Sequence, residues 1–337
     1  MTAVVDSELQ DFGKEWRSRL SAITPTVMAR QSFGTNGSWL SITPGALRFD
    51  HWVEPVSQVA NSSVRDRHVL FDRDQLDKTV PLPLESPPTS ILKLNELRAW
   101  ASDCLALQPH SRGLLSLECT HTLRWILYMA MVELNRPLPT TGLKQWSRKL
   151  TDAQRTVFES LPTDDPDPTR AELDDLLGPI EVADARPDLG RALVAPEGYI
   201  RGLFLPDLSR DEQFQRLSEE FLALHLYLTV ILHREDWLLG VEGVYSLRRL
   251  LHEFFLAGIN RPSTPDALSW EQRLDPSRRA ELMSLPTGSA AKDAVIHDHR
   301  VIKEVFTRVA RSELGDQYPT ELEQVVEAHI REAAMEP

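Results

Sequence analysis

Arg48, Asp50 and His51 lie close together in the chain and carry side chains with which a protein could do chemistry. Residues 46–53 form a predicted strand, in which successive side chains point to opposite faces. Arg48 and Asp50 would therefore share one face with Trp52, while His51 points the other way. Asp50 could bind a metal ion on that face or form a structural pair with Arg48. Because one carboxylate cannot assemble a two-metal centre, the strand by itself leaves both roles open.

Other polar clusters have weaker patterns. The acidic turn at 72–74 favours a solvated hairpin over a cation site. His297 and His299 are two residues apart, so on a helix they point about 200° apart and do not easily share an ion. We therefore predict a solvated helix start at 297–299. Three histidines on apolar helices are predicted to be satisfied core or boundary residues: His121, His225 and His233.

The elements that must position these residues include two copies of one helical unit. Residues 97–163 align with residues 221–287 at an offset of 124, with one residue gained and then lost near 135–143. Such self-similarity is typical of a tandem architecture. The matched positions include Leu123-Arg124 with Leu247-Arg248, Asn135-Arg136-Pro137 with Asn260-Arg261-Pro262, Trp146 with Trp270, and Ser160-Leu161-Pro162-Thr163 with Ser284-Leu285-Pro286-Thr287.

The hydrophobic periodicity predicts strands early in the chain and helices later. The expected strands are 27–31, 38–43, 46–53 and 67–71, with a hairpin turn at Pro44-Gly45. The expected helices are 6–20, 94–107, 112–135, 143–150, 210–233, 292–311 and 320–334. Thr151 with Gln154 three residues later is a capping-box pattern that starts a further helix.

These elements predict an α+β protein that is mostly α. A small partial sheet domain would occupy residues 1–90, because the four prolines at 81–88 mark a boundary. The first helical unit would span 91–163. An acidic, proline-rich linker with one short helix would follow at 164–209, and the second unit with closing helices at 210–337.

The amino-acid composition indicates which classes of partner the protein could bind. The chain has 37 basic and 50 acidic residues, a formal net charge of −13. An acidic surface repels phosphate backbones, which argues against nucleic acid; it suits a cationic small molecule or simply gives solubility. Cys104 and Cys119 fit a reducing compartment. Residues 1–10 lack a signal-peptide pattern and the most apolar stretch, 221–232, is too short to span a bilayer, so we expect a cytoplasmic protein without a membrane partner.

The first half of the chain also resembles a known family. The relevant segments are AVVDSELQDFGKEWRSRL, ITPGALRFDHWVEP and HVLFDRD, followed by the helical segments LRWILYMAMVELNR and LKQW. In pattern and order they resemble the nucleotidyltransferase superfamily, in the bacterial group near the aminoglycoside nucleotidyltransferases. The resemblance covers roughly residues 1–163 and implies a small nucleotidyltransferase-type sheet followed by a helical domain.

The resemblance implies a site of three carboxylates that hold two Mg²⁺ ions against a nucleoside triphosphate. Two carboxylates come from a D-x-D pair after a Gly-Ser turn, and the third from a later strand. Phe49-Asp50-His51 matches the third, which implies a metal-binding and catalytic role for Asp50. The D-x-D pair is not found, because it would directly precede Ala3, and Gly37-Ser38 comes too late in the order. Asp6-Ser7-Glu8 has the right spacing but is better explained as a helix start.

The family's helical domain supplies cationic and aromatic groups to the substrate pocket, which makes Lys144 of the LKQW segment a candidate substrate-binding residue. Lys144 has no basic counterpart in the second copy.

We therefore expect a nucleotidyltransferase-like protein, reduced at its metal site, that acts on or binds a small molecule, with Mg²⁺ and a nucleoside triphosphate if it is active. The alternatives are a non-catalytic descendant that binds a ligand or a partner protein, and an enzyme with different chemistry in the same cleft between the sheet and the first helical unit. In that last case Asp50, Arg48 and His51 would be the first residues to test. A reduced sheet would expose core surface, which the second helical unit or a partner chain must cover, so a homodimer is also open.

Overall fold

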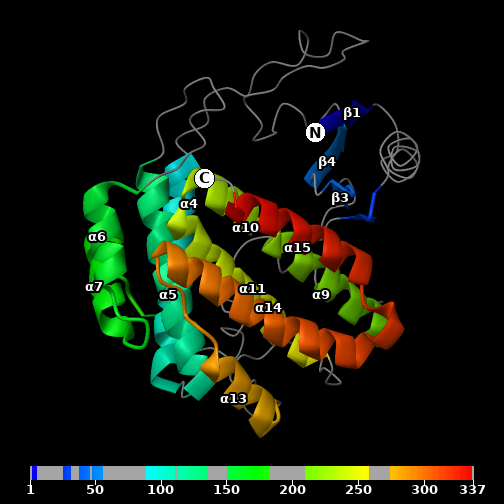
Figure 1. Ribbon diagram of the computed structural model, residues 1–337. Helices are drawn as coiled ribbons and strands as arrows, with labels where there is room; N and C mark the ends of the chain where they lie inside the picture. The colour runs from blue at the N-terminus through cyan, green and yellow to red at the C-terminus, as the bar shows by residue number, and fades with distance from the viewer. Residues whose placement is uncertain are drawn as a thin grey trace.

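The computed structural model describes residues 2–5, 26–31, 38–45, 48–55, 89–110, 113–135, 150–182, 209–257 and 274–335. Within these ranges the protein is mostly helical, with one small sheet beside the helical body (Figure 1). The predicted helix at 6–20 and strand at 67–71 lie outside the described residues. So do the helix predicted at 143–150, apart from Leu150, and Lys144.

The sheet has four strands in the order β1-β4-β3-β2. They are β1 (Thr2–Val5), β2 (Met28–Gln31), β3 (Ser38–Ile42) and β4 (Arg48–Pro55). The antiparallel pairing of β3 with β4 around a turn at Pro44-Gly45 confirms the predicted hairpin. β1 pairs in parallel with the other side of β4. Four short strands do not identify a fold family, so the nucleotidyltransferase type of the sheet stays a prediction.

The first helical unit is built around one long apolar helix. Its helices are α4 (Thr89–Leu107), the 3-10 turn η1 (Gln108–His110), α5 (Gly113–Leu134), α6 (Asp152–Ser160) and α7 (Pro166–Leu177). α5 is buried over most of its length: its apolar residues pack into the core, and several of its polar side chains, such as those of Glu118 and Arg124, are buried with it. The capping box that starts α6 is confirmed: the Thr151 side chain accepts from Gln154 N, and the Gln154 side chain accepts from Thr151 N.

The second unit follows the same plan with one break. Its elements are α9 (Arg210–His225), α10 (Leu228–Arg234), α11 (Trp237–Ala257), α13 (Pro276–Ser284), α14 (Lys292–Leu314), η4 (Gly315–Gln317) and α15 (Thr320–Met335). The prediction of one continuous helix over 210–233 was wrong, because α9 stops before Leu226. At the break, the carbonyl oxygen of Leu226 accepts from Thr229 twice, from the backbone N at 3.1 Å and from Oγ1 at 2.8 Å.

The internal repeat is visible in three dimensions. Arg124 on α5 donates from Nη1 to the carbonyl oxygens of Leu161 (2.5 Å) and Pro162 (3.1 Å). Arg248 on α11 makes the same pair of bonds to Leu285 (2.9 Å) and Pro286 (3.2 Å), each partner 124 residues further along. In both copies a buried arginine therefore fixes the end of a short helix, α6 or α13, to the central helix.

The segment 164–209 does more than link the two units. Its predicted short helix, α7, packs against α5 through the buried side chains of Thr169 and Leu173. At the repeat offset, α7 falls where α14 begins in the second copy, and α14 packs against α11 in the same way. The packing of each unit therefore includes a helix beyond the aligned sequence.

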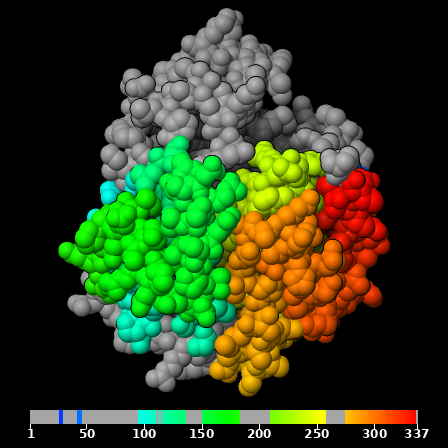
Figure 2. Space-filling view, turned by 60° about the vertical axis from the view of Figure 1, so that its left-hand side comes forward, coloured from blue at the N-terminus to red at the C-terminus, as the bar shows by residue number. Residues whose placement is uncertain are grey.

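The two units share one hydrophobic core and lie side by side on one face of the molecule, the first in cyan to green and the second in yellow-green to red (Figure 2). The sheet meets the second unit. Met28 and Ile42 belong to an apolar cluster with residues of two helices. The helical members are Leu222 and Ala223 of α9, Leu226 directly after α9, and Leu322 and Val326 of α15. The second unit of the same chain thus covers part of the sheet, whereas the cleft expected from the resemblance lay between the sheet and the first unit.

Within the described ranges, no helix combines the length and apolar character needed to cross a bilayer.

Candidate functional site

Asp50 lies on an inner strand of the sheet. In the register of β3 with β4, Asp50 is opposite Leu40, Arg48 is opposite Ile42, and His51 is opposite Trp39. The side chains of Arg48, Asp50 and His51 are outside the described part of the structure, so the faces they occupy remain predictions.

The strand β1 lies directly beside β4. The two strands are parallel, with Thr2 opposite Trp52 and Val4 opposite Glu54. Asp50 comes two residues before Trp52 on β4, so it lies beyond the amino-terminal end of β1 and not beside its middle. From that end, β1 runs in the direction away from Asp50.

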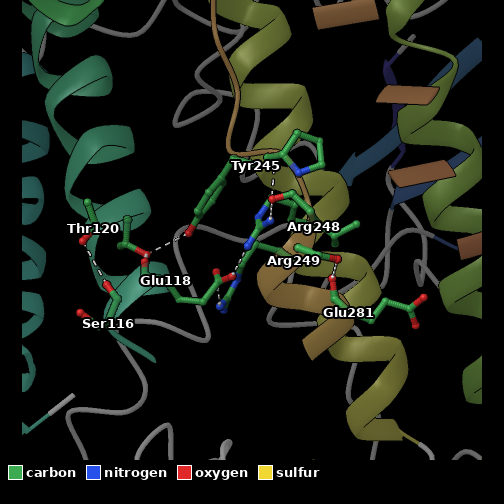
Figure 3. Close-up of polar contacts among 11 residues, drawn as sticks. Ser116, Glu118, Thr120, Tyr245, Arg248, Arg249 and Glu281 are labelled. Atoms are coloured by element: carbon green, nitrogen blue, oxygen red, sulfur yellow. Dashed lines mark hydrogen bonds and ion pairs between the residues drawn. The ribbon is translucent and has the colours of Figure 1, made fainter. Parts of the chain in front are cut away.

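A buried ionic network joins the two central helices (Figure 3). Glu118 on α5 accepts from Arg248 Nη2 at 3.2 Å and lies 3.7 Å from Arg249 Nη1, both on α11. The three side chains are at most 2% exposed to solvent. Burial tends to lower the pKa of Arg249, but the neighbouring Tyr245, Glu118 and Glu253 raise it above the usual value.

The network has the properties of a structural connection. A buried ion pair whose partners also make hydrogen bonds is costly to break, because removing one partner leaves an uncompensated charge. Glu118 and Arg248 come from different copies and are 130 residues apart. Their pairing therefore specifies how the two units meet. The internal repeat singled out Arg248 because it aligns with Arg124, but it did not predict that Glu118 would be the ion-pair partner.

Tyr245 adds a polar contact to the same interface. Its hydroxyl is 3.1 Å from Thr122 Oγ1 of α5, and its ring stacks on Trp125 with centroids 6.3 Å apart. Burial raises the pKa of Tyr245 to about 12. The phenol therefore stays protonated near neutral pH, which suits hydrogen bonding and not proton abstraction.

A second polar cluster joins α9, α14 and α15. His225 and His299 stack with ring centroids 5.8 Å apart, and His225 Nε2 lies 3.5 Å from Glu327 Oε1. Lys303 Nζ lies 3.0 Å from the same carboxylate oxygen. The adjacent His225, together with Lys303, lowers the pKa of Glu327 to about 2 even though burial opposes the shift.

The prediction of a solvated helix start at 297–299 was wrong. These residues lie inside α14, where His299 is fully buried and Asp298 nearly so, while His297 is exposed. Helical periodicity explains the difference, because α14 presents one side to α11 and α9 and the other to solvent. His121 and His225 are buried as predicted, whereas His233 is exposed. The prediction that the buried pair is satisfied was wrong, because His121 Nε2 and His225 Nδ1 have no hydrogen-bond partner among the described residues.

Among the described residues, no group of three or more histidine, cysteine, aspartate or glutamate side chains could hold a metal ion. Cys104 and Cys119 are buried thiols that form no disulfide. Burial, reinforced by Cys119, raises the pKa of the Cys104 thiol well above its ordinary value, so this cysteine is held in its less reactive form.

Comparison with known proteins gives no relative: no protein-family model, no curated protein and no solved structure matches this chain. Functional assignment therefore depends on the residues themselves.

Proposed function

We propose that the protein is a nucleotidyltransferase-like protein whose sheet binds a magnesium–nucleoside triphosphate at the level of Asp50 and which binds a small molecule beside it. The pairing of β1 with β4 carries this proposal. In the resembling family the segment that corresponds to Ala3–Asp6 follows the D-x-D pair, and the three carboxylates belong to one sheet. The pairing of β1 with β4 supports the proposal because it is compatible with that arrangement.

The residues at this site fit nucleotide binding better than nucleotidyl transfer. Asp50 would hold Mg²⁺, and the ion would neutralise charge on the phosphates. Arg48 is two residues away on the same strand, and strand alternation would place its guanidinium on the same face to contact a phosphate oxygen. A single carboxylate does not assemble the two-metal arrangement that transfer requires, so binding is the activity we propose.

The proposal predicts that Mg²⁺ with ATP or GTP raises the melting temperature. A ligand at about 100 times its Kd stabilises the folded state by about 2.7 kcal/mol, which gives a shift of several degrees. Asp50→Asn should abolish the shift because it removes the metal ligand. Asp164→Asn changes an exposed carboxylate between α6 and α7 and is the matched control.

Differential scanning fluorimetry at several nucleotide concentrations, with and without Mg²⁺, measures these shifts. A shift that survives in Asp50→Asn would contradict the assignment of Asp50, and the absence of any shift in the unchanged protein would contradict nucleotide binding.

A non-catalytic descendant is the second candidate. It is favoured by the packing of Met28 and Ile42 against α9 and α15, which uses one part of the sheet as a structural surface. In that case the unchanged protein would show no nucleotide-dependent stabilisation.

A further inference from the structure

A small cavity lies between the two helical units, close to the buried ionic network. It encloses about 20 Å³ and opens to solvent. This volume exceeds what one ordered water needs, so the cavity can admit the end group of a ligand but not a whole small molecule. Four aromatic side chains contribute to its walls: Trp125, Tyr128, Phe158 and Tyr245.

The cavity lies where the internal repeat predicts a second ion pair, equivalent to that of Glu118 with Arg248. α5 and α11 meet in an antiparallel sense, because Glu118 contacts Arg248 and Thr122 contacts Tyr245. The approximate two-fold relation between the copies maps Arg248 onto Arg124 and Glu118 onto Glu242. Both mapped residues line the cavity, yet they form no ion pair equivalent to that of Glu118 with Arg248.

Arg124 is only 7% exposed, and its charge has no carboxylate partner in the described part of the chain. Its guanidinium donates to the carbonyl oxygens of Leu161 and Pro162 and lies 4.9 Å from the centre of the Phe158 ring. Burial lowers the pKa of Arg124 from its usual value. An anion next to this group would therefore gain a charge-assisted interaction in a weakly solvated place.

His121 provides a second polar group at the same cavity. The side chain is 4% exposed, and its Nε2 has no hydrogen-bond partner among the described residues. Burial, together with the charges of Arg248 and Arg124, lowers the pKa of His121 well below its ordinary value. A neutral imidazole can donate one hydrogen bond, so His121 can donate to a carboxylate oxygen without adding a charge of its own.

We propose that this cavity binds the carboxylate of a small acid with an aromatic or apolar body. The carboxylate takes the place beside Arg124 that Glu118 takes beside Arg248, and His121 donates to it. The body of the ligand extends out of the cavity along Trp125, the one aromatic side chain of the lining that is only partly buried. The site is separate from the sheet and does not depend on the proposed nucleotide binding.

The charge of Glu242 affects how tightly this cavity would bind an acid. Its side chain is half-buried in the cavity wall and has an interaction partner of its own. Its negative charge disfavours a bound carboxylate. Neutralising Glu242 should therefore strengthen binding of an acid and weaken binding of a cation, which distinguishes an anion site from a cation site.

The test is isothermal titration of the full chain near pH 7 with three ligands of one shape: benzoate, benzamide and benzylammonium. Benzoate should bind at one site, more tightly than the other two. Glu242→Gln should tighten benzoate binding by about threefold to tenfold, a range typical of removing one nearby charge in a partly solvated site. Arg124→Gln, whose amide can still donate to a carbonyl, should abolish benzoate binding.

Glu304→Gln and Arg300→Gln, at exposed positions of α14, are the matched controls and should leave benzoate binding unchanged. If Arg124→Gln does not fold, the change in benzoate affinity of Glu242→Gln tests the proposal. The proposal is overturned if benzoate shows no saturable binding, if benzamide or benzylammonium binds as tightly, or if Glu242→Gln fails to strengthen benzoate binding.

Discussion

His299 shows how burial changes the chemistry of one residue. Burial and the adjacent His225 lower its pKa to about 3, although the carbonyl oxygen of Gly240, 3.4 Å from Nε2, works in the opposite direction. The ring is therefore neutral in the folded protein over the whole range in which an exposed histidine titrates.

This environment predicts a loss of stability in mild acid. The unfolded chain takes up a proton on His299 below about pH 6.5, whereas the folded protein does so only below about pH 3. Between these values the unfolded state binds more protons, so stability falls as the pH falls. The contribution of His299 to the loss between pH 7 and pH 5 is about 2 kcal/mol.

Urea unfolding at pH 7 and pH 5 measures this effect. His299→Gln should reduce the difference in unfolding free energy between the two pH values by about 2 kcal/mol. His297→Gln changes an exposed histidine on the same helix and is the control. Equal pH dependence in the two variants would show that His299 is not the responsible group.

At the scale of elements, the contact of α11 with α14 depends on two glycines. A Cβ atom at Gly240 would lie 2.5 Å from Val295 Cγ1, and one at Gly243 would lie 2.8 Å from His299 Nε2. The two helices therefore approach more closely than alanine would permit. At the repeat offset these glycines replace Ser116 and Cys119 of the first copy.

Gly240→Ala should destabilise the protein by about 1 to 3 kcal/mol, the usual cost of overpacking a filled core, although alanine is the better helix former. Val295→Ala removes the methyl groups that clash. If the contact is the cause, the double variant should be more stable than the sum of the two single changes predicts, as measured by urea unfolding. Strict additivity would rule out a steric origin.

The elements were predicted with uneven success. The capping box at Thr151 and the hairpin at Pro44-Gly45 were identified from the sequence, because both depend on residues that are neighbours in the chain. The break after His225 was missed, since the apolar periodicity continues through it. The burial of Asp298 and His299 was missed because it depends on which side of α14 faces the other helices.

At the scale of the whole molecule, the sheet is attached to the helical body through a small apolar cluster. Ile42 is fully buried and Met28 nearly so, both against α9 and α15. The second helical copy therefore has a role that the first does not have in the described structure.

Ile42→Ala should loosen the sheet more than the bundle. Truncation of a buried isoleucine costs about 2 to 5 kcal/mol, and Ile42 lies in the apolar cluster that joins the sheet to α9 and α15. Hydrogen exchange followed by mass spectrometry should show faster exchange in β2, β3 and β4, with α5 unchanged.

Leu173→Ala in α7 is the matched control, because it opens a cavity in the first unit and should leave exchange in the sheet unchanged. Equal acceleration in the sheet and in α5 after Ile42→Ala would show that the two parts unfold as one body.

The amino-acid sequence by itself determined the duplication, the mostly helical character and most helix and strand positions, because periodicity, caps and turns are local properties of the chain. The tertiary structure decided which distant residues meet. Glu118 pairs with Arg248 and Arg249, whereas Arg124 lies at a cavity and has no such carboxylate among the residues that the structure describes. The two related sequences form similar sets of helices, but the charges at their contact depend on residues more than 100 positions apart. The proximity of such residues is fixed only when the helices pack.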